Sequence, residues 1–271
     1  MQFSTAIPSA APPNPEEQSP SIGSEDPLAD DLAVVWVQPD EVLQLKDSAG
    51  IAGTTITTLT YDQQSILPTG VRTSLGSSTW LEVRTSTDEI GWLPSWNLTE
   101  QVPAAAFCHD PRIGEMLDEF ATSLAEEDSG TLRSLLSPKR GLIIRHDPSN
   151  PEVRIPEGKL QGIFSDPHVY RWGTRFASQT IIQGSFNEVV VPALLEVLVA
   201  DPIVACNEVE VGRNADAESL PPMYQNLNFI NLYRPASEGG NSFNWRTWVI
   251  LFEYVEGQPY IALLLQIRPQ V

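Results

Sequence analysis

The chain has 271 residues, of which 35 are acidic and 16 are lysine or arginine, so its formal net charge is -19. Such a length allows two modest domains, each with its own hydrophobic core. The sequence contains no stretch rich in lysine and arginine, which excludes nucleic acid as a partner, because binding to a phosphate backbone depends on clustered positive charge. The acidic residues are spread along the chain, and this indicates a role in solubility rather than an acidic binding face.

Residues 1–31 contain six prolines and six acidic residues but no basic residue. A segment of this composition cannot bury enough apolar surface to offset the entropy lost on ordering, so we predict a disordered tether rich in proline, serine and acidic residues. No apolar stretch of the kind found in secretory signals follows Met1. The chain is therefore expected either to be cytoplasmic or to be a mature fragment that begins with an added methionine.

Residues 32–102 contain short β-rich segments separated by turn residues. Six short strands within some seventy residues are typical of a small β-barrel. The strands are expected at Leu32–Val37, Val42–Lys46, Ile56–Leu59, Ser65–Leu67, Trp80–Arg84 and Ile90–Leu93.

Three motifs in this region are specific enough to suggest a family. They are Trp80-Leu81-Glu82-Val83, Gly91-Trp92-Leu93 and Trp96-Asn97-Leu98, and together they resemble the last strands of a bacterial SH3-like domain. The sequence departs from that family around Leu45-Lys46 and Ala49-Gly50, where the family's proline is missing. The resemblance implies binding rather than catalysis, with cell-wall peptide or a protein partner as the ligand of an exported protein.

The aromatic residues of this region could either line a binding groove or fill the core of the barrel. We expect Trp80 and Trp92 to lie in the core. Tyr61 and Trp96 are the two candidates for a ligand-binding surface.

Beyond residue 102 the pattern changes to helices. Asp110 as N-cap and Pro111 at the first position open a helix whose apolar residues from Ile113 to Leu124 share one face. A second short helix is expected to be capped by Ser129 and to end before Pro138.

A third helix is predicted from a capping box formed by Ser185 and Glu188, and it should run to about Val199. Pro192 lies inside it and cannot donate a backbone hydrogen bond, so we predict a kink or a late start there. Strands are expected at Leu142–Arg145, Val169–Trp172, Val204–Val211 and Leu227–Tyr233.

The last element is a β-hairpin from Arg246 to Arg268, with Glu256-Gly257 as a two-residue turn. With this turn, one face of the hairpin should be wholly apolar, and the other should mix apolar and polar residues. We expect the mixed face to be half covered and to carry a pocket or a subunit contact. The preceding strand should join the hairpin in an antiparallel sheet. The predicted cross-strand pairs are Val255 with Gln258, Phe252 with Ile261, Ile250 with Leu263, and Trp248 with Leu265.

The expected fold is therefore a two-domain one. An all-β SH3-like barrel at residues 32–102 precedes an α+β domain at residues 103–271, in which helices pack on a curved antiparallel sheet. The order of elements resembles a nuclear-transport-factor-2-like (NTF2-like, cystatin-like) cone. A closer resemblance, to an uncharacterised domain of exported bacterial lipoproteins, is carried by Cys108, Ser137-Pro138-Lys139-Arg140-Gly141-Leu142, Trp172-Gly173, Gly184-Ser185-Phe186, Cys206-Asn207 and Asn244-Trp245-Arg246-Thr247-Trp248.

The chain has two cysteines, Cys108 and Cys206, and neither lies in a spacing typical of zinc sites. The residues alone leave two alternatives open, a single disulfide or two buried free thiols. The lipoprotein resemblance favours the disulfide, because both cysteines lie in matching motifs. It also implies an extracytoplasmic location, in the cell envelope or secreted, with contact to a membrane only through a lipid anchor upstream of Met1.

Few residues of the sequence lie in patterns typical of catalytic sites. His109, His146 and His168 have no metal-ligand spacing, and there is no GxSxG motif or glycine-rich phosphate loop, so we expect neither a metal nor a cofactor. Adjacent Cys108-His109 is a poor geometry for a cysteine hydrolase. The carboxylates of Asp118, Glu119 and the stretch 126–128 are best interpreted as a solvated face.

The remaining candidate surface combines the mixed face of the hairpin with Tyr170, Trp172, Trp245 and Arg246, because an arginine among aromatic rings suits a carboxylate or a planar group. The alternative is that Arg246 merely lies along Trp245 and Trp172 at the rim of the sheet. The sequence thus favours a non-enzymatic extracytoplasmic binding protein. A hydrolase or other enzyme using a cavity in the α+β domain, and a structural spacer, are the alternatives.

Overall fold

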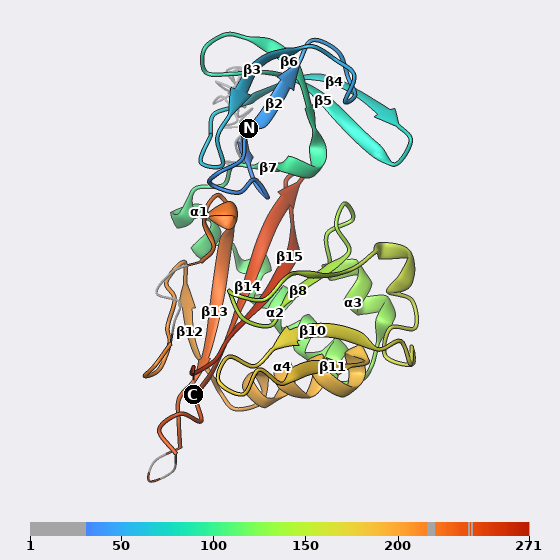
Figure 1. The fold of residues 1–271 in the computed structure, drawn as a ribbon. Coiled ribbons are helices and arrows are strands. Elements are labelled where there is room, and N and C mark those ends of the chain that lie inside the picture. Colours follow the sequence, from blue (N-terminus) through green and yellow to red (C-terminus); the bar gives the residue numbers. More distant parts are fainter. Residues whose placement is uncertain (1–30, 216–219, 238, 240, 271) are drawn as a thin grey trace, which may run out of the picture.

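The computed structural model describes residues 31–215, 220–237, 239 and 241–270, so the predicted tether lies outside the described residues apart from Asp31. The structure is rich in β-sheet, with helices confined to the part of the chain beyond residue 102 except for one short turn. Below, residues 31–102 are called the N-terminal unit and residues 103–270 the C-terminal unit. Figure 1 shows the N-terminal unit seated on the end of the large sheet of the C-terminal unit.

The N-terminal unit contains a five-stranded antiparallel sheet in the order β3-β2-β6-β5-β4 and a separate ribbon of β1 and β7. A short 3-10 turn, η1 (Ser95–Asn97), precedes the last strand. Buried aliphatic side chains from every strand except the exposed β4 form its core. The strands are β1 (Leu32–Val34), β2 (Leu43–Lys46), β3 (Thr55–Leu59), β4 (Leu67–Leu75), β5 (Ser78–Arg84), β6 (Ile90–Pro94) and β7 (Leu98–Glu100).

Strand β4 is where the sequence prediction for this unit was wrong. A strand was expected at Ser65–Leu67, but the strand begins at Leu67 and runs to Leu75. Its side chains are almost all exposed, and it contains Pro68 and Gly70, so it lacks the alternation that identifies a half-buried strand. Pairing with β5 holds it at the edge of the sheet, where proline is tolerated.

The C-terminal unit is built on a six-stranded sheet in the order β12-β13-β14-β15-β8-β9. Strands β12 to β15 are antiparallel neighbours, as predicted for the strand that precedes the hairpin. Strand β8, however, pairs with β15 in parallel, so the sheet is mixed rather than antiparallel. More than a hundred residues separate these two strands along the chain, so no tight turn dictates their relative direction. The strands are β8 (Leu142–Arg145), β9 (Val153–Ile155), β12 (Ile203–Cys206), β13 (Asn228–Arg234), β14 (Arg246–Val255) and β15 (Gln258–Ile267).

The register of the terminal hairpin was predicted correctly only next to its turn. Val255 pairs with Gln258 and Phe252 with Ile261, as expected. The register then shifts by one residue at Ala262, so the remaining predicted pairs are wrong. Because the residues on both sides of this β-bulge are apolar, the sequence pattern does not reveal it. The observed pairs beyond it are Leu251 with Leu263, Ile250 with Leu264, Val249 with Leu265 and Trp248 with Gln266.

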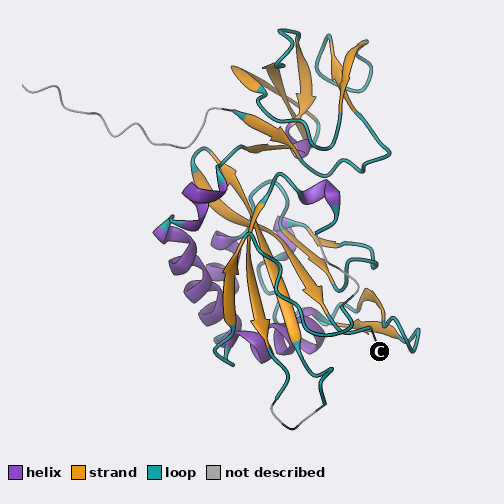
Figure 2. Cartoon of the chain, turned by 90° about the vertical axis from the view of Figure 1, so that its left-hand side faces the viewer, coloured by secondary structure: helices purple, strands orange, loops and turns teal. Residues whose placement is uncertain are grey.

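Both faces of the sheet are covered, which corrects the expectation of a half-covered mixed face. One face packs against the helices, which gather on one side of the sheet in Figure 2. The other face packs against the segment that contains Met223 and Tyr224 and against Val35 and Trp36 of the N-terminal unit. The charged residue of the supposedly mixed face, Glu253, is 1% exposed.

The helices begin where their capping residues predict. The Asp110 side chain accepts a hydrogen bond from the Arg112 backbone N (3.0 Å), so α2 (Pro111–Ala125) begins as expected. The cap of α3 (Ser129–Leu135) is Asp128 and not Ser129, because its carboxylate is the group that accepts from the backbone of the first turn. A short helix, α1 (Ala104–Cys108), precedes both.

The predicted capping box of Ser185 and Glu188 is present, with the Glu188 backbone N donating to Ser185 Oγ (3.2 Å). The segment after the cap is a π-helix, η3 (Phe186–Val190). The regular helix α4 (Val191–Leu198) begins only after η3, and Pro192 lies in its first turn. This confirms the predicted late start, because proline has no N–H to donate. The remaining elements are the hairpin of β10 (Tyr170–Thr174) and β11 (Ile181–Gly184) and the turns η2 (Glu157–Lys159) and η4 (Pro222–Tyr224).

A disulfide joins Cys108 at the end of α1 to Cys206 at the end of the edge strand β12, with Cα atoms 5.9 Å apart. This confirms the disulfide that the lipoprotein resemblance favoured. Within the described part of the chain, no helix combines the length and the apolar character that crossing a membrane requires.

Candidate functional site

A cleft of about 330 Å³ opens where the N-terminal unit meets the turn between β14 and β15. Its size is at the lower end of the range for ligand-binding pockets. Apolar side chains from both units line it, and four charged side chains stand among them. The apolar residues are Leu32, Pro68, Leu81, Leu98, Tyr254 and Val255, and the charged residues are Arg72, Glu100, Lys139 and Glu256.

Two contacts across the cleft hold its walls together. The Glu100 carboxylate, on β7, accepts hydrogen bonds from the backbone N atoms of Glu256 (2.5 Å) and Gly257 (2.9 Å), so it caps the turn of the opposite unit. The Arg72 guanidinium lies 3.3 Å from the Glu256 carboxylate, but these side chains are 72% and 81% exposed, so this ion pair adds little. The backbone contacts of Glu100 are therefore the more important link.

Beside the cleft, a buried arginine joins the two units. The Arg140 guanidinium lies between the rings of Trp36 and Trp96, at 3.8 Å and 4.7 Å from their centroids. Its Nε donates to Glu253 Oε2 (2.9 Å), and its Nη1 donates to the Trp96 carbonyl oxygen (2.7 Å). The cation thus contacts aromatic rings, a carboxylate and a backbone carbonyl at once, which are the partners that a desolvated guanidinium requires.

The Glu253 carboxylate is the centre of this network. Lys139 Nζ lies 3.1 Å from it and also donates to the Leu98 carbonyl oxygen (2.9 Å), and the Ser137 hydroxyl donates to it as well. Burial by itself raises the pKa of Glu253, but the positive charges of Arg140 and Lys139 outweigh burial and hold that pKa below its ordinary value. Burial lowers the pKa of Lys139, and the attraction of Glu253 offsets this only in part. These contacts stabilise the ionised form of the Glu253 carboxylate, so the network suits a structural joint between the two units.

A second set of polar contacts extends the joint. Trp36 Nε1 donates to Glu152 Oε1 (3.0 Å), the Tyr224 hydroxyl donates to the same carboxylate, and Arg154 pairs with it (2.6 Å). The Arg154 guanidinium also lies 4.9 Å from the ring centroid of Trp96. Both tryptophans are therefore engaged by residues of the C-terminal unit.

The structure places the two ligand candidates of the N-terminal unit as partly buried side chains. Tyr61 packs against the core of that unit. Trp96 packs in the joint between Trp36, Arg140 and Arg154, so its ring faces are used within the molecule. Trp80 is buried as expected, whereas Trp92 is only half-buried.

The four ligand candidates of the C-terminal unit are not brought together. Trp172 is fully buried with the helices on one side of the sheet, and its Nε1 donates to the Gly184 carbonyl oxygen (3.0 Å). Trp245 is buried on the other side, and its Nε1 donates to the Arg213 carbonyl oxygen (2.9 Å). Tyr170 packs on Trp172 with ring centroids 5.0 Å apart, and Arg246 lies 3.8 Å from Glu196. The sheet therefore separates the two indoles, and the structure does not bring these four residues together on one surface.

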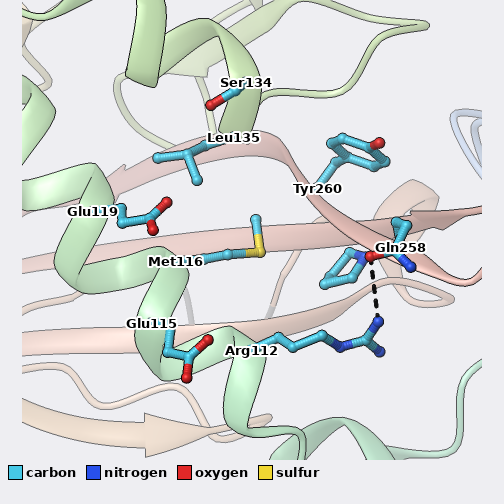
Figure 3. A pocket seen from close by; sticks show the side chains of 9 residues that line it. Arg112, Glu115, Met116, Glu119, Ser134, Leu135, Gln258 and Tyr260 are labelled. Atoms are coloured by element: carbon cyan, nitrogen blue, oxygen red, sulfur yellow. Dashed lines mark hydrogen bonds between the residues drawn. The ribbon is translucent and has the colours of Figure 1, made fainter.

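A further open pocket of about 310 Å³ lies between α2 and the terminal hairpin (Figure 3). Arg112 is tied to its edge by a hydrogen bond to the Gly257 carbonyl oxygen (3.0 Å). Figure 3 shows Glu115 and Glu119 projecting from α2 on the side of Met116, with Tyr260 opposite. Both carboxylates are exposed, which fits the interpretation of this helix face as solvated.

The histidines and cysteines offer no assembled reactive site. Within residues 31–215, 220–237, 239 and 241–270, no group of three or more His, Cys, Asp and Glu side chains could hold a metal ion. His109 Nδ1 contacts the Ala105 carbonyl oxygen (2.7 Å), and Cys108 is oxidised in the disulfide. The cysteine-hydrolase alternative therefore lacks the free thiolate it requires.

His146 is the one buried histidine, and it predicts a pH dependence of stability. Its ring lies between Trp172 and Trp248, its Nδ1 contacts Gln266 Oε1 (2.9 Å), and it is 1% exposed. Burial, followed by the charge of Arg268, lowers its pKa from 6.5 to about 4. The unfolded chain therefore takes up a proton at a pH where the folded chain does not, and the stabilising contribution, complete above pH 6.5, is lost as the pH falls toward 4.

The loss should amount to about 3 kcal/mol of unfolding free energy. Chemical denaturation at a series of pH values measures it. In the variant His146→Gln, which retains a polar group for Gln266, the total loss of unfolding free energy between pH 6.5 and pH 4 should be smaller by this amount. An unchanged pH dependence would mean that the pKa of His146 is the same in the folded and the unfolded chain.

Comparison of the chain with protein-family models, with curated proteins and with solved structures finds no match.

Proposed function

We propose that this chain is a non-enzymatic, extracytoplasmic binding protein, in which residues 32–102 act as an SH3-like module. The module contacts cell-wall peptide, with a protein partner as the alternative ligand. The observation that carries the proposal is the cleft of about 330 Å³ between the two units, because it combines an apolar lining with a few charged groups at a joint that keeps its walls in place.

The arrangement of the N-terminal unit supports an SH3-like module. It is a small antiparallel sheet with a 3-10 turn before its last strand. The motif Trp80-Leu81-Glu82-Val83 lies on β5, and Gly91-Trp92-Leu93 lies on β6. A side chain at Gly91 would come within 3.0 Å of the Lys46 carbonyl oxygen and the Leu45 side chain, so glycine is required by the close approach of β2.

The disulfide supports an extracytoplasmic location, because disulfides persist in oxidising compartments and are rare in the cytosol. It joins the segment that follows the N-terminal unit to the edge of the large sheet. The disulfide therefore stabilises the C-terminal unit, whose turn between β14 and β15 forms one wall of the cleft.

Exposed aliphatic side chains support a binding role for the N-terminal unit. They are found on β3, β4 and β6 and in the loop after β2, and one of them, Ile51, is 92% exposed. Leu75 lies against the same loop, since a Cβ on Gly50 would be 3.1 Å from its side chain. A contiguous apolar patch on a protein surface often marks a contact site. The exposed aliphatic side chains are Val42, which immediately precedes β2, and Ile51, Ile56, Leu67, Val71, Leu75 and Ile90.

Co-sedimentation of the full chain with purified peptidoglycan tests the proposal. The wild-type chain should be retained. Replacing the exposed cleft residue Pro68 with glutamate should weaken retention about tenfold, because a charge would then stand in the apolar part of the lining. Val255→Thr, which keeps the shape of the side chain, should weaken it less.

The control is Val199→Glu, which changes an equally apolar side chain that is 77% exposed in the C-terminal unit and outside the cleft. It should bind like the wild type, and the melting temperatures of all variants should show that they are folded. If the wild-type chain is not retained, cell-wall peptide is not the ligand. If Pro68→Glu is retained as well as Val199→Glu, the cleft is not the site.

A further inference from the structure

Three arginines lie side by side at the end of the large sheet that is opposite the cleft. Arg234 is the last residue of β13 and pairs directly with Arg246, the first residue of β14. Arg268 follows the end of β15, next to the pair of Thr247 and Ile267. Like charges in directly opposed positions destabilise a sheet, so this placement has a cost unless negative charge lies among them.

A fourth arginine and two carboxylates complete the cluster. Arg175, in the turn between β10 and β11, is close enough to Arg246 and Arg268 to lower their pKa values together with burial. Glu196 of α4 approaches Arg234 (2.6 Å) and Arg246 (3.8 Å), and Asp147 attracts Arg268 weakly. Four positive charges thus face two negative ones, in a chain with a net charge of -19.

The Glu196 carboxylate cannot neutralise the whole cluster. One of its oxygens is taken by Arg234 and the other faces Arg246. In the described part of the chain, neither Arg175 nor Arg268 has a carboxylate within ion-pair distance. Arg268 is nevertheless largely buried, and burial first, followed by Arg246 and Arg175, lowers its pKa to about 10. A guanidinium in such surroundings is stabilised by any oxyanion that reaches it.

Buried donors without acceptors lie at the same place. Gln266 is 0% exposed, and its Oε1 accepts from Arg268 Nε (2.6 Å) and contacts His146 Nδ1. Because an oxygen is needed to accept from Arg268, the orientation of this amide is settled, and its Nε2 has no acceptor among the described residues. The same is true of Arg234 Nε. Buried donors in proteins are rarely left without a partner.

We propose that the arginine row, Arg175, Arg234, Arg246 and Arg268, is a binding site for an oxyanion group, a carboxylate or a phosphate ester. Guanidinium groups bind such groups through paired N–H donors, and several of them around one group favour it over chloride. This site lies beyond the proposed function of the cleft, because the two are at opposite ends of β14 and β15 (Figure 1). The sequence also indicates Arg246 as a ligand-binding residue, but with aromatic rings instead of the three other arginines as its neighbours.

The test is a titration of the full chain at neutral pH and constant ionic strength. Inorganic phosphate is the probe for phosphate esters and acetate is the probe for carboxylates, with sodium chloride as the reference. The melting temperature and isothermal calorimetry are the readouts. We expect saturable binding of phosphate, of acetate or of both, and the stronger probe identifies the class of ligand.

Arg268→Gln and Arg246→Gln should each weaken this binding about tenfold, since each removes a charge-assisted hydrogen bond. The matched control is Arg84→Gln in the N-terminal unit, which should bind as the wild type does. Without added anion, Arg268→Gln should melt at the same temperature as the wild type or higher, because it removes repulsion within the row. A purely structural role for Arg268 would instead lower the melting temperature.

Two results would overturn the proposal. One is that neither phosphate nor acetate has an effect beyond that of chloride. The other is that binding is equally strong in Arg246→Gln, Arg268→Gln and Arg84→Gln, which would locate it elsewhere.

Discussion

Replacing Glu253 with glutamine should lower the free energy of unfolding by about 3 to 5 kcal/mol, the range found when one partner of a buried ion pair is removed. Glu253 is 1% exposed, and its carboxylate is the counter-charge of both Arg140 and Lys139. Without it, the joint contains two cations, Arg140 and Lys139, that have lost their shared counter-charge. Arg140 Nε then has no carboxylate to which it can donate. Chemical denaturation at neutral pH measures the change.

The exposed pair of Arg72 and Glu256 provides the control, because it also links the two units but is solvated. Glu256→Gln should cost less than about 1 kcal/mol. A double variant, Arg140→Met with Glu253→Gln, should be more stable than the sum of the single changes predicts, since the Arg140 cation that Glu253→Gln leaves unpaired is then absent as well. If Glu253→Gln costs no more than Glu256→Gln, the network is solvated and does not hold the units together.

Replacing Cys206 with serine should lower the free energy of unfolding by about 2 to 5 kcal/mol. The bond closes a loop with a sequence separation of 98 residues, and opening a loop of this length gives the unfolded chain a large gain in conformational freedom. Thermal and chemical unfolding of the oxidised protein and of the variant measure the difference.

Cys108→Ser should have the same effect as Cys206→Ser, and the double variant should be no less stable than either, because all three lack one and the same bond. A reductant should lower the melting temperature of the wild-type chain but not that of the variants. Melting temperatures unchanged by Cys206→Ser and by reductant would show that the two thiols are not paired in solution.

The two proposed binding regions can be separated experimentally because they share strand β14 but no residues. The cleft is lined by the turn end of β14, whereas the arginine row begins at the first residue of the same strand. A variant in one region leaves the lining of the other unchanged. Loss of peptidoglycan binding in Pro68→Glu therefore says nothing against the oxyanion site, and loss of phosphate binding in Arg268→Gln says nothing against the cleft.

Local features of the sequence determined where most elements begin. Asp110 before Pro111 marks the start of α2, and Ser185 with Glu188 marks a helix start that Pro192 then delays. The turn at Glu256-Gly257 gives the first pairs of the hairpin. These signals are readable because each depends on residues within four positions of one another, where backbone hydrogen bonds and proline geometry act.

Only the tertiary structure decided how distant segments meet. The bulge at Ala262 and the parallel pairing of β8 with β15 depend on packing across the sheet, and runs that are apolar on both faces do not encode them. The sequence placed Trp172 and Trp245 on one surface, but the sheet lies between them. Conversely, Arg234, Arg246 and Arg268 are scattered along an acidic chain and become neighbours because antiparallel strands align their ends. Arg175 approaches them from the turn after β10. Charge density in space depends on strand register, and a linear charge pattern does not contain that information.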